Sequence, residues 1–120
     1  MNKTIVIPVL NTEYKVVFTY GTPEEIKRVL KRYYYPMEKI LSDHFDGRGV
    51  CFHWPGVHPV IAMPQIPKTS DQIGTLAHEA IHAIDDIFEK IGETGSREVY
   101  AHCVRAVVTG VLDYYRSKKC

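Results

Sequence analysis

The sequence predicts an α+β domain with a small antiparallel or mixed sheet on one side and helices on the other. Two observations predict this class. Short runs rich in β-branched and aromatic residues occur near the N-terminus and again in the middle of the chain, whereas longer segments carry apolar residues at helical spacing. We expect the order strand, strand, helix, strand, strand, helix, helix, in one domain that covers residues 1–120.

The first two predicted strands are residues 4–10 and 14–20, on either side of the turn-like residues 11–13. This arrangement indicates a β-hairpin. Pro8 has no N–H to donate to a neighbouring strand, so we expect the first strand to lie at a sheet edge or to contain a bulge.

Residues 50–54 and 58–63 are the second predicted pair of strands, because both are short apolar runs. Three prolines stand within or just after the later strand, at Pro59, Pro64 and Pro67. Because each proline removes a donor from the strand ladder, we expect this strand to lie at a sheet edge.

The first helix is expected to begin after Thr22, which can cap it, with Pro23 in the first helical position and Glu25 completing a capping box. Pro36 is expected to kink or restart this helix, and the apolar spacing then continues toward Phe45.

Two long helices are predicted in the second half of the chain. Ser70 is the expected N-cap of the first, which runs to about Ile91 and ends in a turn at residues 92–95. Ser96 is expected to cap the last helix, over about residues 97–117.

The first of these long helices contains the motif H-E-x-x-H, formed by His78, Glu79 and His82. Residues four apart lie on the same face of a helix, so both imidazoles can bind one zinc ion. Glu79 then lies beside the ion and suits a general base for water whose pKa the zinc has lowered.

The context strengthens the motif, which composition alone would produce by chance with a probability on the order of a few per cent. Its flanking residues are small or aliphatic, and polar side chains in an apolar helix are costly to bury without a partner. A bound ion would remove that cost. The alternative is an exposed or hydrogen-bonded polar face without metal.

A catalytic zinc site normally has three protein ligands and one open position. The metzincin pattern would place the third ligand in the same helix, but Asp85 and Phe88 occupy its glycine and histidine positions. The remaining candidates are Asp85, Asp86, Glu98 and His102. Asp85 would have difficulty reaching the same ion and is expected to form hydrogen bonds with a ligand histidine or a neighbouring group.

The segment "TLAHEAIHA" followed by Glu98-Val99-Tyr100-Ala101-His102 resembles the gluzincin branch of the zincin metallopeptidases. It resembles more closely the very small H-E-x-x-H proteins of bacteriophages. The resemblance covers roughly residues 50–112 and implies a minimal zincin-like domain that binds Zn²⁺. It also implies that Glu98 is the third ligand and that His102 orients a ligand histidine.

The helix lengths leave the third ligand open between Glu98 and His102. A tight hairpin around residues 92–95 would place Glu98 near residue 90, too far from His78 and His82, unless the motif helix ended early. The group that would stabilise the oxyanion is also open. The candidates are Tyr100, His58, His53 and Tyr114.

The zincin resemblance further implies that the edge strand above the motif helix pairs with an extended peptide or protein substrate, here near residues 59–64. An ordinary edge strand is the alternative. The net charge of +1 gives no general case for nucleic acid or membrane binding. A basic face on the first helix, with Lys27, Arg28, Lys31 and Arg32, is read as solvated, with an acidic or nucleic-acid partner as the minority interpretation.

Two functions are therefore predicted, and a metal-free structural domain is the remaining alternative. The first is a zinc-dependent hydrolase, a small metallopeptidase. We expect it in the cytoplasm, because the 3 widely spaced cysteines indicate reduced thiols. The second is a non-catalytic zinc-binding module, phage-encoded, that captures or inhibits a target, because a chain this small leaves little room for a deep cleft. Glu79 favours the first, since a purely structural zinc site needs no acid beside its ligands.

Overall fold

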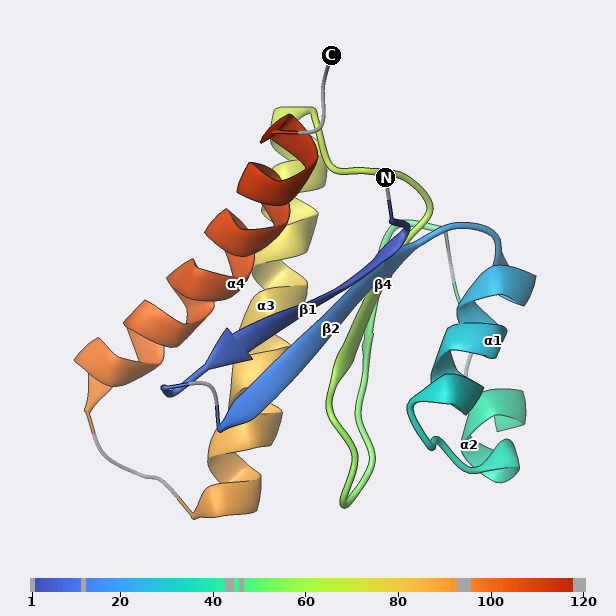
Figure 1. The fold of residues 1–120 in the computed structure, drawn as a ribbon, viewed down its shortest axis with the longest axis horizontal. Coiled ribbons are helices and arrows are strands. Elements are labelled where there is room, and N and C mark those ends of the chain that lie inside the picture. Colours follow the sequence, from blue (N-terminus) through green and yellow to red (C-terminus); the bar gives the residue numbers. More distant parts are fainter. Residues whose placement is uncertain (1, 12, 43–44, 46, 93–95, 118–120) are drawn as a thin grey trace.

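A computed structural model describes residues 2–11, 13–42, 45, 47–92 and 96–117 of the chain (Figure 1). It confirms the α+β class and the predicted order of elements, except that the first predicted helix is two separate helices, because the chain restarts after Pro36. The strands are β1 (Thr4–Val9), β2 (Tyr14–Tyr20), β3 (Val50–Phe52) and β4 (Val60–Met63), and the helices are α1 (Pro23–Arg32), α2 (Met37–Ser42), α3 (Ser70–Ile91) and α4 (Arg97–Ser117). None of the helices in the described segments combines the length and the apolar character needed to cross a membrane.

The strands form one mixed sheet with the order β1-β2-β4-β3. β1 pairs with β2 and β3 pairs with β4, both antiparallel, as the two predicted pairs require, and β2 pairs with β4 in parallel. β1 lies at an edge, as Pro8 predicts. Residue 12, in the turn predicted between the first two strands, lies outside the described residues.

The prediction that residues 59–64 form an edge strand is wrong, because β4 has a neighbour on each side. The prolines do not interrupt its ladder. Pro59 precedes the first strand residue, and its carbonyl accepts a 3.0 Å hydrogen bond from the N–H of Val17, while Pro64 follows the last strand residue. The second edge of the sheet is formed by β3 instead.

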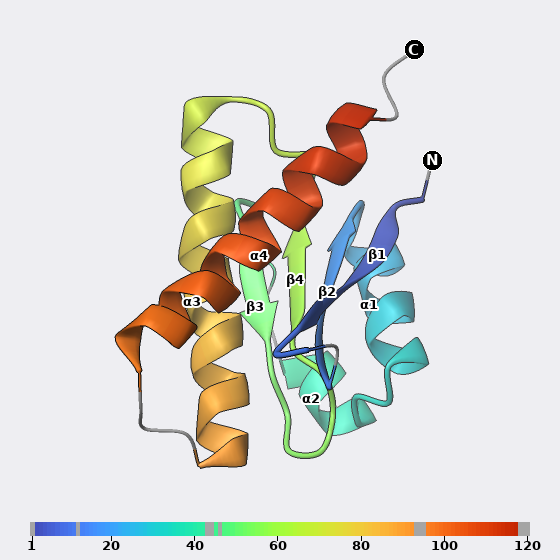
Figure 2. The ribbon, with the colours of Figure 1, turned by 60° about the vertical axis from the view of Figure 1, so that its left-hand side comes forward.

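Helices cover both faces of the sheet, and not one face as the sequence predicted (Figures 1 and 2). Alternation along β2 explains the two layers: Val16 and Phe18 pack in the core beneath α3 and α4, whereas Val17 packs in the core beneath α1. β4 alternates in the same way, with Ile61 in the first core and Val60 in the second. A sheet buried on both faces needs an apolar layer on each side.

The N-termini of the helices follow local sequence rules. The capping box predicted for α1 is confirmed, with both of its hydrogen bonds present. In α3 the cap is Thr69, and not Ser70 as predicted, because Gln72 reaches back to the backbone of Thr69. A cap at Ser70 would have placed Ile73 at the position whose side chain must accept that bond.

The connection between α3 and α4 agrees with the prediction where the structure describes it. Gly92 ends α3 with a φ of 69°, in the left-handed region that glycine tolerates best. The hydroxyl of Ser96 accepts hydrogen bonds from the N–H groups of Glu98 and Val99 and so begins α4. Residues 93–95 of the predicted turn lie outside the described residues.

Tyr35, after α1, holds β3 and its connection to β4 in place. The side chain is buried, and its hydroxyl shares its proton between the carbonyl oxygens of Phe52, at 2.9 Å, and His58, at 2.7 Å. The position of the sheet edge nearest α3 therefore depends on a tyrosine from the opposite face.

Replacing Tyr35 with Phe should lower the free energy of unfolding by about 1–3 kcal/mol, because two carbonyls lose their donor. Urea denaturation followed by circular dichroism measures this change. Tyr34→Phe is the control, since Tyr34 is 84% exposed, and should change stability by less than about 0.5 kcal/mol. Equal effects of the two substitutions would contradict the role assigned to Tyr35.

Candidate metal centre

The apolar stripe of α3 sets the direction of the motif side chains. The buried residues of this stripe pack in the core between α3, α4 and the sheet: Leu76, Ala80, Ala83, Ile84 and Ile87. At 100° per residue, His78 and His82 fall on the opposite side of the helix, and both are exposed. Glu79 falls on the flank that faces β3 and is half-buried.

The two motif histidines face each other across one helical turn. Their Nε2 atoms are 3.2 Å apart, and their ring centroids are 4.9 Å apart. Two nitrogens bound to one tetrahedral zinc at its usual Zn–N distances would be separated by about 3.3–3.4 Å. The separation of the two nitrogens is therefore close to that of two coordination positions on one zinc ion.

Glu79 lies between two hollows on the surface, and each contains one motif histidine. A hollow of about 410 Å³ between α3 and β3 is lined by Glu79 and His82, and one of about 490 Å³ near the start of α3 is lined by Glu79 and His78. The first hollow also contains Cys51 and His53 of the β3 region. The carboxylate thus reaches space that a substrate and water can occupy.

Asp86 links α3 to the β3 side of the site. Its Oδ2 lies 2.7 Å from the ammonium group of Lys90, and its Oδ1 lies 3.8 Å from Nδ1 of His53. Lys90 also donates a 2.6 Å hydrogen bond to the carbonyl of Val57 in the connection between β3 and β4. Asp86, a candidate ligand from the sequence, is therefore engaged in an ion pair that positions β3 against α3.

Asp85 and Tyr100 link α3 to α4. The hydroxyl of Tyr100 donates a 2.7 Å hydrogen bond to Oδ1 of Asp85 and lies 3.3 Å from the carbonyl oxygen of Ile81. The ring of Tyr100 meets Phe88 edge to face, with centroids 5.4 Å apart. Burial, and then the bond to Asp85, raises the pKa of Tyr100 to about 12. Of the two kinds of partner expected for Asp85, a motif histidine or a neighbouring group, the structure shows a neighbouring group, the hydroxyl of Tyr100.

The structure does not bring Glu98 or His102 together with the motif histidines. α3 continues to Ile91, so Tyr100 is the residue of α4 that contacts the turn after His82, while Glu98 and His102 are exposed. Among the described residues, no three His, Cys, Asp or Glu side chains form a group that could hold a metal ion. The choice of third ligand stays a prediction.

The oxyanion candidates differ in their positions. His53 lines the hollow that contains Glu79 and His82, whereas His58 is exposed in the connection between β3 and β4 and does not line that hollow. Sequence reasoning named His53 without preferring it, and it did not assign Cys51 or Lys90 to the site. The closeness of Cys51 to α3 depends on the strand order, which no local pattern reveals.

Comparisons of the chain with family models, with curated proteins and with solved structures find no match. The site is therefore interpreted from its own geometry and chemistry.

The purified protein should bind about one zinc per chain through the histidine pair. His78→Ala and His82→Ala should each weaken zinc binding on the order of a hundredfold or more, since each removes a directly bound nitrogen. Competition with a chromophoric chelator measures the affinity. His58→Ala is the control and should leave the zinc affinity unchanged. Purified protein that contains no metal and does not bind added zinc would contradict the assignment of His78 and His82 as zinc ligands.

Glu98→Ala should weaken zinc binding more than His102→Ala does, if Glu98 moves to the ion when zinc binds. The same competition assay compares the two variants. The reverse order would make His102 the third ligand, and two unchanged affinities would show that α4 supplies none.

Proposed function

We propose that this protein is a zinc-dependent hydrolase, and specifically a small metallopeptidase of the gluzincin type. The observation that carries the proposal is the 3.2 Å separation of the Nε2 atoms of His78 and His82, next to a carboxylate that lines a hollow. Two nitrogens at this separation match adjacent positions of a tetrahedral zinc ion. A carboxylate beside them matches the general base of metal-assisted hydrolysis.

His78, His82 and Glu98 would hold the zinc, with His102 as the alternative third ligand. The zinc would supply an acidified water and would polarise the carbonyl of the substrate. Glu79 would accept a proton from the attacking water and would deliver it to the leaving amine, a task that suits a carboxylate on the flank of α3. His53, on the opposite wall of the same hollow, would donate a hydrogen bond to the oxygen where negative charge develops.

An extended peptide would bind along β3. This strand forms the sheet edge beside the Glu79 hollow, and an edge strand has backbone groups free to pair with another strand. β3 therefore replaces residues 59–64 in the proposed substrate contact. The rim of the hollow carries Asp85 and Glu89, which favours a peptide with a basic side chain next to the cleaved bond.

The second candidate function is a non-catalytic zinc-binding module, phage-encoded, that captures or inhibits a target protein. The exposed position of both histidines favours it, together with the lack of a third ligand beside them among the described residues. In that case the zinc would bridge this protein to a side chain of its target, and Glu79 would have no chemical role.

We place the protein in the cytoplasm. Cys51 and Cys103 are free thiols, and burial raises the pKa of both, so they remain protonated and unreactive near neutral pH. Thiols of this kind are typical of proteins in reducing compartments.

Glu79→Gln separates the two functions. It should keep the zinc affinity and lower peptide hydrolysis at least about a hundredfold, because general-base catalysis contributes on this scale. A library of fluorogenic peptides with the zinc-loaded protein gives the rate. Glu24→Gln is the control, since Glu24 is an exposed carboxylate on α1 that does not line this hollow, and should retain activity. Activity that survives Glu79→Gln would contradict the mechanism, and zinc-loaded wild-type protein with no activity would favour the binding module.

A further inference from the structure

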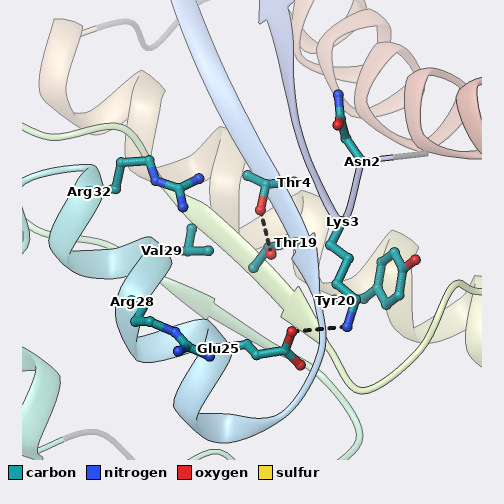
Figure 3. Close-up of a pocket in the computed structure, with 9 residues that line it drawn as sticks. All are labelled: Asn2, Lys3, Thr4, Thr19, Tyr20, Glu25, Arg28, Val29 and Arg32. Carbon is teal, nitrogen blue, oxygen red and sulfur yellow. Dashed lines mark hydrogen bonds and ion pairs between the residues drawn. The ribbon is translucent and has the colours of Figure 1, made fainter.

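A third hollow, of about 470 Å³, lies between α1 and the strands β1 and β2, on the sheet face opposite the histidine pair (Figure 3). Strand residues form one wall and α1 residues form the other, and the lining consists of Asn2, Lys3, Thr4, Thr19, Tyr20, Glu25, Arg28, Val29 and Arg32. Its volume lies in the range of sites for small molecules, about 300–1,000 Å³.

The charges of this hollow are unbalanced. The carboxylate of Glu25 is fully engaged: Oε1 accepts a 3.0 Å hydrogen bond from the N–H of Thr22, and Oε2 lies 2.9 Å from the ammonium group of Lys3. The bond from Thr22, and then the contact with Lys3, lowers the pKa of Glu25 to about 2. Glu25 therefore neutralises Lys3 and leaves the arginines without compensation.

Arg28 and Arg32 stand one helical turn apart on α1, and both project toward the strands (Figure 3). Neither guanidinium forms an ion pair with a carboxylate of the described residues. Two planar guanidinium groups that flank one hollow are suited to bind the oxygens of a single anion in a bidentate manner.

The strand wall adds two hydroxyl groups. Thr4 and Thr19 lie opposite each other in the sheet, and their Oγ1 atoms are 2.9 Å apart. Thr19 is only 2% exposed. Its hydroxyl is therefore a buried polar group in a strand whose preceding residues, Val16 to Phe18, are all apolar. The pair uses one hydroxyl proton, so the other remains available to donate to a ligand that faces Arg28 and Arg32.

We propose that this hollow is a binding site for a phosphate monoester of a small organic molecule. Arg28 and Arg32 bind the phosphate oxygens, and the Thr4–Thr19 pair donates one further hydrogen bond. Val29 is the apolar side chain of the α1 wall that the organic part would meet. The site is separate from the zinc centre and does not depend on hydrolase activity.

Calorimetric titration with inorganic phosphate, adenosine monophosphate and adenosine tests the proposal. Both phosphate-containing probes should bind, the monoester more tightly, and adenosine should not. Arg28→Gln with Arg32→Gln should weaken monoester binding about ten- to a hundredfold, the loss expected for charge-assisted hydrogen bonds. Glutamine is a good helix former, and circular dichroism should show an unchanged fold.

Lys27→Gln with Lys31→Gln is the matched control. It removes the same charge at the same spacing from the same helix, but neither lysine lines the hollow. This control should bind the monoester within about twofold of the unmodified protein, which excludes general attraction to a basic helix. The double variant His78→Ala with His82→Ala should do the same, which excludes binding of the phosphate to zinc at the histidine pair. An equal loss in the lysine control, or no binding below about 10 mM, would overturn the proposal. Tighter binding of a single-stranded oligonucleotide, lost equally in both α1 variants, would assign the basic face to nucleic acid instead.

Discussion

The rotational setting of α3 on the sheet determines the rest of the site. One apolar stripe, from Leu76 to Ile87, must be buried, and the geometry of the helix then fixes where every other side chain points. His78 and His82 are directed away from the sheet, and Glu79 is directed toward β3. Rotating α3 by one residue would bury a histidine and expose the stripe, so folding stability itself orients the chemical groups.

Contacts on both sides of α3 maintain the orientation of this helix about its axis. On one side, Lys90 bridges Asp86 and the carbonyl of Val57, which holds the β3 region beside Glu79. On the other side, Tyr100 binds Asp85 and holds α4. The acidic residues nearest the motif thus position neighbouring elements, whereas the histidine pair faces solvent and Glu79 lines the hollow beside β3.

Most features set by local sequence were predictable, with the cap of α3 at Thr69 as the exception, and features set by strand order were not. The H-E-x-x-H pair, the hairpin of β1 and β2, and the box at Thr22 depend on residues a few positions apart. The parallel pairing of β2 with β4 joins residues about forty apart along the chain. Because of this pairing, the sheet edge is β3 and not β4, which the sequence predicted. The same limitation applies to Glu98, because its distance from the histidines depends on where α3 ends and on how α4 crosses it.

A crystal structure of the zinc-loaded protein, with anomalous data collected at the zinc edge, tests the central claim most directly. We expect one ion between Nε2 of His78 and Nε2 of His82, with a third protein ligand and a water next to the carboxylate of Glu79. An ion bound elsewhere, or four protein ligands that leave no place for water, would contradict it.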